Sequence, residues 1–320
     1  METPPPLVSV IIPVRNGRGY IDEAIASVLS QSFQAFEIVV INDGSTDGDY
    51  ESLTSTDPRI RLLRLGGCGV STARNHGMRA ARGELIAFLD ADDVWFPGKL
   101  QAQVNYMNAH PEVGVVFGGF LKWEADAGGE FPLASGMVSN CLPLTSPEVA
   151  RSGWLYSRLL MGLLVGMNTA MVRRSVVDAI GDFNTSLRQA EDYDFWLKAS
   201  RVAEMHALDG PVALYRIHPA SAMHRLAPDN ALVNVLHAAR LRWGLKGPGG
   251  DSLNARAFQR RMAQIQFDHG YAHFWQGNRS VARRAFWRAL RVGFRSGRCA
   301  VYIALSWLPF RAKRSEVSSA

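Results

Sequence analysis

Short apolar runs alternate with segments of helical character through the first 120 residues. The apolar runs lie at residues 8–13, 36–41, 60–65, 84–89 and 113–120. Helices are expected between them over residues 19–31, 71–81 and 97–110, the first from apolar side chains three or four positions apart. Because strands alternate with helices, the pattern predicts an α/β fold with a doubly wound, mostly parallel sheet flanked by helices.

The alternation becomes irregular after residue 122. Residues 123–148 are rich in Gly, Pro and Ser and predict a long surface loop. Further elements are expected as a helix near 147–164, a strand at 168–173, a helix from Glu191 and a strand at 211–215. Residues 229–310 carry helical patterns throughout. We therefore expect an α/β domain over residues 1–228 and a basic helical region appended to it over residues 229–320.

The two predicted parts carry opposite net charge. Residues 229–320 contain 16 Lys or Arg and 4 Asp or Glu, a net charge of +12, and the remaining residues have a net charge of −6. A basic tail on an acidic domain would suit an anionic lipid surface, a nucleic acid or an acidic polymer. The longest apolar stretch near the end, residues 299–310, is too short to cross a bilayer.

Cysteine usage and the first residues favour a cytoplasmic protein. The 3 cysteines lie far apart without CxxC spacing, so neither a disulfide framework nor a zinc site is expected. Residues 1–6 lack the basic and apolar regions of a signal peptide. A reducing cytoplasm is the simplest setting for such a chain.

Carboxylates gather where two predicted strands end. Asp43 follows the run at 36–41, and Asp90, Asp92 and Asp93 follow the run at 84–89. The carboxyl end of a parallel sheet is where open α/β folds bind ligands. Closely spaced carboxylates repel one another unless a cation lies between them, and Mn²⁺ or Mg²⁺ would fit and could bridge to a diphosphate. The alternative is a polar turn in which Asp93 caps a helix.

The loop after the first strand, Pro13-Val14-Arg15-Asn16-Gly17, contains no GxGxxG fingerprint, and no Walker A motif occurs in the chain. A dinucleotide site is therefore not expected. Arg74, early in a predicted helix near the sheet edge, would suit a diphosphate or base contact. Its alternative is a solvated helical arginine.

Two later positions carry further candidate chemistry. Asp192, within Glu191-Asp192-Tyr193-Asp194, would act either as a general base toward a sugar hydroxyl or as part of a helix cap. His218 follows the predicted strand at 211–215 and would either bind a metal or phosphate or be structural.

The last predicted helices combine arginines with aromatic residues. The arginines from Arg283 to Arg298 alternate with Trp287, Phe294 and aliphatic side chains. A helix lying on a membrane surface has this pattern, and so does an exposed helix packed on a domain.

In combination these motifs resemble glycosyltransferase family 2, whose members have the GT-A type fold. The resemblance covers residues 7–220 in order and rests on residues 8–16, 27–33, 37–47, 69–77, 83–93 and 191–196. It implies an inverting transfer of a sugar from a nucleotide-diphosphate sugar to a saccharide or lipid-linked hydroxyl acceptor. This would serve cell-surface polysaccharide or glycolipid synthesis, with no nucleic acid as partner. Residues 279–314 lie outside the resemblance, and their basic and aromatic series predicts peripheral attachment to the inner face of a membrane.

The resemblance also implies roles for single residues. Asp43 would contact the nucleotide base and Arg74 the nucleotide, while Asp90 would lie on the ribose side. Asp92 would hold the metal, and Asp192 would be the catalytic base. His218, named above from its position after a strand and not from the resemblance, is the candidate second metal ligand. Pro13, Val14 and Arg15 would lie near the base, although many members carry Tyr where this chain has Arg15.

Two other classes of protein remain open at this point. A sugar-nucleotide nucleotidyltransferase would be expected to carry a Gly-rich basic loop after its first strand, where this chain has Pro13-Val14-Arg15-Asn16. A noncatalytic lipid- or nucleic-acid-binding protein would need neither Asp92 nor Asp192.

Overall fold

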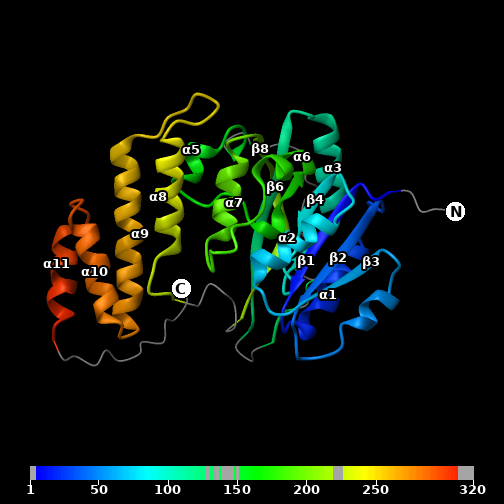
Figure 1. Ribbon diagram of the computed structural model, residues 1–320, viewed down its shortest axis with the longest axis horizontal. Helices are drawn as coiled ribbons and strands as arrows, with labels where there is room; N and C mark the ends of the chain where they lie inside the picture. The colour runs from blue at the N-terminus through cyan, green and yellow to red at the C-terminus, as the bar shows by residue number, and fades with distance from the viewer. Residues whose placement is uncertain are drawn as a thin grey trace. The chain divides into compact units, whose positions relative to one another are not determined.

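The computed structural model describes residues 5–126, 130–132, 134, 137, 148, 151–218 and 226–308. Its contacts divide the chain into two compact units, here called unit 1 (Met1–Pro219 with Gly247–Gly250) and unit 2 (Ala220–Lys246 with Asp251–Ala320). Unit 1 contains the sheet, and unit 2 is helical (Figure 1). Unit 2 thus begins before the boundary expected after residue 228.

One mixed sheet of eight strands forms the centre of unit 1, in the order β3-β2-β1-β4-β7-β6-β8-β5. Four neighbouring pairs are parallel (β2/β3, β1/β2, β1/β4 and β6/β8), and β7 and β5 run antiparallel to their neighbours. The expected mostly parallel sheet is therefore confirmed. The strands are β1 Val8–Val14, β2 Phe36–Asp43, β3 Ile60–Leu65, β4 Leu85–Phe88, β5 Val94–Trp95, β6 Val113–Glu124, β7 Met171–Arg173 and β8 Glu204–Ile217.

Helices flank this sheet, and most of the expected ones form. The α-helices of unit 1 are α1 Arg18–Leu29, α2 Val70–Ala80, α3 Lys99–Ala109, α5 Tyr156–Leu159, α6 Arg174–Ile180 and α7 Glu191–Ala199. The helix expected near 147–164 is wrong in extent, because α5 spans four residues within the described part of that range. Most of the loop expected at 123–148 lies outside the described residues. The strand expected at 168–173 is shortened to β7, because residues Met167–Thr169 form a 3-10 turn, η3. Another 3-10 turn, η1 Glu51–Ser55, precedes β3.

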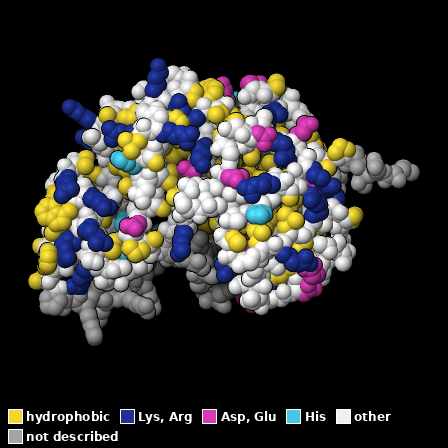
Figure 2. Space-filling view, viewed as in Figure 1, with side chains coloured by type: hydrophobic (Ala, Val, Ile, Leu, Met, Phe, Trp, Pro, Cys, Tyr) yellow, Lys and Arg dark blue, Asp and Glu magenta, His cyan; other side chains and the backbone are white. Residues whose placement is uncertain are grey.

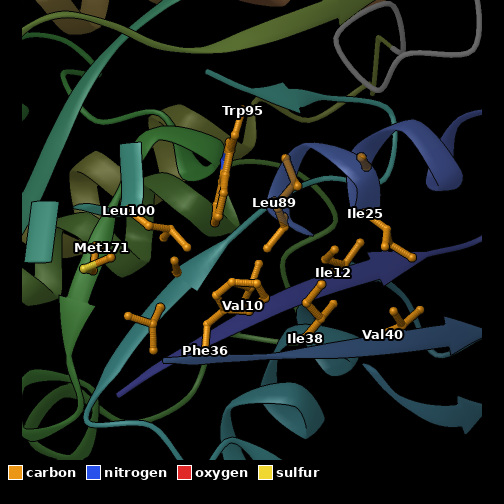
Figure 3. Packing of buried hydrophobic residues seen from close by; sticks show 14 of the residues in the cluster. Val10, Ile12, Ile25, Phe36, Ile38, Val40, Leu89, Trp95, Leu100 and Met171 are labelled. Atoms are coloured by element: carbon orange, nitrogen blue, oxygen red, sulfur yellow. The ribbon is translucent and has the colours of Figure 1, made fainter. Parts of the chain in front are cut away.

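A hydrophobic cluster lies between one face of the sheet and helices α1 and α3. Alternate residues of β1 and β2, among them Val10, Ile12 and Val40, pack there with Ile25 of α1 and Leu100 of α3 (Figure 3). All five side chains are at most 4% exposed. Burial of each side chain contributes about 1.5–3 kcal/mol to the stability of the fold. This packing holds β1 and β2, and therefore the loops at their ends, in place.

Helix α2 covers the opposite face of the sheet at very close range. A Cβ added to Gly77 would lie 2.6 Å from Cγ2 of Ile11 and 2.8 Å from Cδ1 of Ile41. Only glycine allows the helix backbone to approach β1 and β2 this closely. The approach holds α2, which begins at Val70, against the strands whose ends form the candidate site.

Unit 2 consists of α8 Ala231–Trp243, α9 Ala255–Trp275, α10 Arg279–Leu290 and α11 Ser296–Leu305, as the helical pattern predicted. Its own hydrophobic cluster joins Phe267 and Phe274 of α9, Phe286 of α10 and Cys299 and Ile303 of α11. Unit 2 therefore has a separate core. Among the described helices of both units, none combines the length and apolar character that crossing a membrane requires.

Candidate active site

The candidate site lies at the edge of the sheet where the parallel strands β1, β2 and β4 end. Their shared direction places the residues that follow Val14, Asp43 and Phe88 at this one edge. The loops after β1 and β2 are cross-linked there. Ser45 Oγ accepts a 3.0 Å hydrogen bond from the backbone N–H of Asn16, whose own Oδ1 accepts one of 2.9 Å from the N–H of Thr46. These two hydrogen bonds connect the loops after β1 and β2 into one platform at this edge.

Asp43 holds a third loop against this platform. Its carboxylate accepts hydrogen bonds from the backbone N–H groups of Gly67 (3.1 Å), Cys68 (2.7 Å) and Gly69 (2.7 Å), and its side chain is buried. The Arg15 guanidinium lies over the same loop, since a Cβ added to Gly67 would be 3.4 Å from its Nη2. Pro13 and Val14 are buried within β1. The structure thus brings Arg15 and Asp43 to one loop, and their contact with a nucleotide stays a prediction.

The three carboxylates after β4 each have a partner of their own. Asp90 accepts a 2.8 Å hydrogen bond from Arg74, and Asp92 Oδ2 lies 2.9 Å from His218 Nε2. Asp93 turns inward, where its carboxylate accepts hydrogen bonds from Asn168 Nδ2 (2.5 Å) and the Arg216 N–H (3.0 Å). The alternative in which Asp93 caps a helix is therefore wrong. Arg74 compensates the charge of Asp90 and thereby relieves part of the repulsion that suggested a metal ion on sequence grounds.

Arg74 connects the acidic motif to helix α7. Its guanidinium bonds Asp90 at 2.8 Å and Glu191, the first residue of α7, at 3.1 Å. Arg74 is 4% exposed, so the alternative of a solvated helical arginine is wrong. The buried Arg74 charge is thus compensated by two carboxylates at once. Arg74 therefore fixes the end of β4 and the start of α7 relative to each other.

Arg216, in β8, positions the backbone of the acidic motif. Its Nε donates a 2.8 Å hydrogen bond to the carbonyl of Asp92, and its Nη2 donates one of 2.5 Å to Glu23. The guanidinium stacks 3.7 Å from the ring centre of Trp123 and is 4% exposed. Nearby, Tyr20 packs at 5.2 Å against the ring of His218. Asp92 and His218 are thus held by neighbours that are themselves fixed.

The residues present fit a divalent cation at Asp92 and His218. A carboxylate oxygen and an imidazole nitrogen already converge to 2.9 Å. Mg²⁺ and similar ions are commonly bound by one or two carboxylates, with substrate phosphates and water completing the shell. Within the described part of the chain, no group of three or more His, Cys, Asp or Glu side chains forms a metal cage. The donor set therefore fits a cation that arrives with a phosphate ligand better than a permanently caged ion.

Asp192 lies in the first turn of α7, next to the residue that Arg74 binds. Its carboxylate accepts a 2.7 Å hydrogen bond from the N–H of Tyr193, so it also helps to cap the helix. Burial, followed by the charge of Glu191, raises the pKa of Asp192 from 3.8 to about 6. The preceding Ala190 has φ of 60°, an uncommon conformation for a residue other than glycine. A carboxylate with this pKa can accept a proton at neutral pH.

Two positioning residues of this site, Arg216 and Glu191, have roles that the local sequence pattern does not reveal. Arg216 stands within an apolar run of β8, and a charged residue in a buried strand is the signal that would have marked it. Glu191 looked like an ordinary acidic residue at a helix start. Its bond to Arg74 joins positions 117 apart in the chain, which no local pattern reveals.

Comparison with known proteins identifies the family. The model of the family described as Glycosyl transferase family 2 matches residues 9–157. The putative teichuronic acid biosynthesis glycosyltransferase TuaG of Bacillus subtilis is 30% identical over 242 residues, which are 74% of this chain and 86% of that protein. This chain belongs to glycosyltransferase family 2. The resemblance seen in the sequence is confirmed, and the nucleotidyltransferase alternative is set aside.

Other family members are longer than this chain. An uncharacterized glycosyltransferase of Rickettsia felis is 33% identical over 240 residues, covering 74% of this chain and 38% of the relative. The chain therefore spans about two fifths of the length of that relative.

Solved glycosyltransferases share the fold. S. aureus TarS 1-349, in complex with UDP-GlcNAc, superposes with a TM-score of 0.63 at 20% identity, covering 94% of this chain and 89% of that one. The mannosyltransferase PcManGT from Pyrobaculum calidifontis, in complex with GDP-Man and Mn²⁺, has a TM-score of 0.58 at 22% identity, covering 96% and 82%. At these identities the match establishes the fold, which is that of the GT-A type glycosyltransferases.

Proposed function

We propose that this glycosyltransferase moves a sugar from a nucleotide-diphosphate sugar to a hydroxyl acceptor with inversion at the anomeric carbon. The observation that carries the proposal is the Asp90–Arg74–Glu191 ion network. It ties the acidic motif at the end of β4 to the helix turn that carries Asp192. A candidate donor site and a candidate base are thereby held on the same edge of the sheet.

The donor would bind over the loops after β1, β2 and β4. Asp43 would fix the loop at residues 67–69 and, with Arg15, would define the surface offered to the base. Asp90 would lie on the ribose side. The related folds that hold UDP-GlcNAc or GDP-Man support a sugar nucleotide as the ligand class.

Asp92 and His218 would hold Mn²⁺ or Mg²⁺. When bound there, such a cation would stabilise the negative charge of the departing diphosphate. Arg216 would keep the Asp92 backbone in place through its 2.8 Å hydrogen bond. The Mn²⁺ in the PcManGT complex supports the choice of metal.

Asp192 would remove the proton from the acceptor hydroxyl as that oxygen attacks the anomeric carbon. The C–O bond to the acceptor forms while the bond to the diphosphate breaks, and the proton goes to the Asp192 carboxylate. Because a single displacement comes from the face opposite to the leaving group, the configuration inverts. A base with a pKa of about 6 is deprotonated at neutral pH and still basic enough to assist.

The acceptor would be a saccharide or lipid-linked sugar in cell-surface polysaccharide or glycolipid synthesis. The teichuronic acid relative supports this class. The basic unit 2 would keep the enzyme at the inner face of an anionic membrane. Trp287 and Trp307 are 49% and 71% exposed and could reach such a surface, whereas Phe294 packs against the core of unit 2. Phe310, Arg311, Lys313 and Arg314, which extend this basic and aromatic series along the sequence, lie outside the described residues.

The mechanism is tested by Asp192→Asn, with Asp194→Asn as the matched control. Asp194 lies in the same helical turn and pairs with Lys198 at 2.6 Å. We expect Asp192→Asn to bind donor nucleotide almost normally but to transfer about 10²–10⁴-fold more slowly, and Asp194→Asn to transfer normally. Loss of donor binding with normal transfer per bound complex would show that Asp192 is a binding residue. Retention of the donor's anomeric configuration in the first product would refute inversion.

A further inference from the structure

A large cavity opens in unit 2, and none of the residues that line it has been given a role in sugar transfer. Its volume is about 870 Å³, and it is formed by residues of α9 and α11 together with Arg279 and Arg295. Small-molecule sites in proteins commonly measure about 300–1,000 Å³. The cavity is therefore large enough for an organic ligand of substantial size.

The walls of this cavity are aromatic and aliphatic side chains that face solvent. Tyr271 and Trp275 of α9 are each 42% exposed, and Val301 and Leu305 of α11 are 56% and 36% exposed. Phe267 and Phe274 continue the wall inward to the core. Contiguous exposed apolar surface of this kind commonly marks a site that binds a ligand or a partner.

Basic residues surround the apolar walls. Arg279, Arg295 and Arg298 line the cavity together with a single acidic residue, Asp268. Arg295 adopts a left-handed backbone conformation, with φ of 43°, directly before the N-terminus of α11 at Ser296. The positive end of that helix adds to the attraction for an anion at the same mouth. Figure 2 shows hydrophobic and basic side chains next to each other where Figure 1 draws α10 and α11.

We propose that this cavity binds one chain of a membrane lipid monophosphate, with the apolar chain on Tyr271, Trp275 and Val301 and the phosphate at Arg295 and Arg298. Apolar walls below a cationic rim complement an amphiphilic anion. A second copy of unit 2 is a poor occupant, because residues 229–320, which include most of unit 2, carry a net charge of +12 and would repel a copy. The site goes beyond the proposed transfer reaction and requires none of the residues of unit 1.

The test is a calorimetric titration of the full chain without any sugar nucleotide. Dodecyl phosphate is compared with dodecyl maltoside, which has the same apolar chain but no charge, both below their micelle-forming concentrations. Inorganic phosphate and a short oligo-dT strand complete the series. We expect saturable binding of dodecyl phosphate at one site per chain, about 10-fold tighter than dodecyl maltoside. Inorganic phosphate and oligo-dT should give no binding in the same range.

Two pairs of variants locate the site. Val301→Asp should weaken binding of both amphiphiles at least about 10-fold, whereas Val292→Asp, at an exposed position outside the cavity, should not. Arg298→Glu should weaken dodecyl phosphate by about 10-fold and leave dodecyl maltoside unchanged, whereas Arg291→Glu should affect neither. Circular dichroism checks that each variant keeps its helices, and if Val301→Asp unfolds, the arginine pair decides.

Several outcomes would overturn the proposal. These are no saturable binding of dodecyl phosphate, equal affinity for the charged and uncharged amphiphiles, or equal effects of the cavity and control variants. Binding of oligo-dT that Val301→Asp abolishes would instead assign the cavity to single-stranded nucleic acid. Because no donor is present, each of these results leaves the transferase proposal untouched.

Discussion

Replacing Asp192 by Asn should stabilise this enzyme at neutral pH while it impairs transfer. In the folded protein, burial and the neighbouring Glu191 carboxylate raise the pKa of Asp192 from 3.8 to about 6. At pH 7.5 the carboxylate is charged in both states, but the charge is held less favourably in the folded state. Asn has nearly the same shape, can still accept the hydrogen bond from the Tyr193 N–H, and carries no charge.

The magnitude follows from the pKa shift and its sign. A shift of about two units, at ~1.4 kcal/mol per unit, corresponds to about 3 kcal/mol of lost stability in the wild type. The penalty is fully present above the folded-state pKa of about 6 and disappears below the unfolded value of 3.8, where the folded and unfolded carboxyls are both protonated. Asp192 keeps some solvent contact, so we expect about 2 kcal/mol for the measured gain.

The assay is urea unfolding followed by circular dichroism at pH 7.5 and at pH 4, comparing the wild type with Asp192→Asn and Asp194→Asn. The gain should appear for Asp192→Asn at pH 7.5 and largely vanish at pH 4. Asp194→Asn should be neutral or slightly destabilising, because it loses the 2.6 Å pair with Lys198, which is worth at most about 1 kcal/mol. A lower free energy of unfolding for Asp192→Asn than for the wild type at pH 7.5, or the same gain in stability at both pH values, would contradict a charge penalty at Asp192.

Three further outcomes are expected. The rate of transfer should fall as pH drops through about 6, to about one tenth of its plateau one unit below, because protonated Asp192 cannot accept the acceptor proton; a flat profile down to pH 4 would exclude Asp192 as the base. Asp92→Asn should lower turnover by at least about 10²-fold at saturating Mn²⁺, since one charged ligand is lost, and unchanged turnover would place the metal elsewhere. Arg216→Lys should weaken metal affinity by about 10–100-fold, because the Arg216 guanidinium positions Asp92 through a hydrogen bond to the Asp92 carbonyl. Added Mn²⁺ should partly restore activity. A loss of activity that Mn²⁺ does not restore would indicate a folding defect instead.

The strands and helices that surround the site follow from the sequence because their signals are local. The runs that became β1, β2 and β4 are mostly apolar, and each is followed by turn residues. The local pattern alone therefore places Asp43, Asp90 and Asp92 at one edge of the sheet. Helix α7 was likewise expected to begin at Glu191, where acidic residues fill its first turn.

Other parts of the fold depend on partners that are distant in the chain. β5 is only Val94–Trp95 and exists through its pairing with Leu214 and Ala213 of β8. β8 itself begins at Glu204, earlier than expected, because polar residues interrupt its apolar pattern while pairing with β6 holds it extended. Neither the hydrophobic periodicity nor the residue composition of a segment predicts which distant strand it pairs with.

The hydrogen-bond partners of the site carboxylates could not be predicted from local sequence patterns either. Three carboxylates within four residues suggest one metal cluster, yet Asp93 faces the interior toward Asn168 and the backbone of Arg216. Its partners lie 75 and 123 positions away. Residue type showed where charge would gather, and only tertiary packing determined which carboxylate remains available to a cation.

The central claim is a metal-dependent transfer from a sugar nucleotide, and release of nucleotide diphosphate from a panel of donors tests it most directly. The purified full chain is incubated with UDP- and GDP-linked sugars, with Mn²⁺, with Mg²⁺ or with excess chelator. We predict release from at least one donor in the presence of a divalent cation and none with chelator. Release that is undiminished by chelator would contradict the metal site at Asp92 and His218, and no release from any donor would contradict the proposed activity.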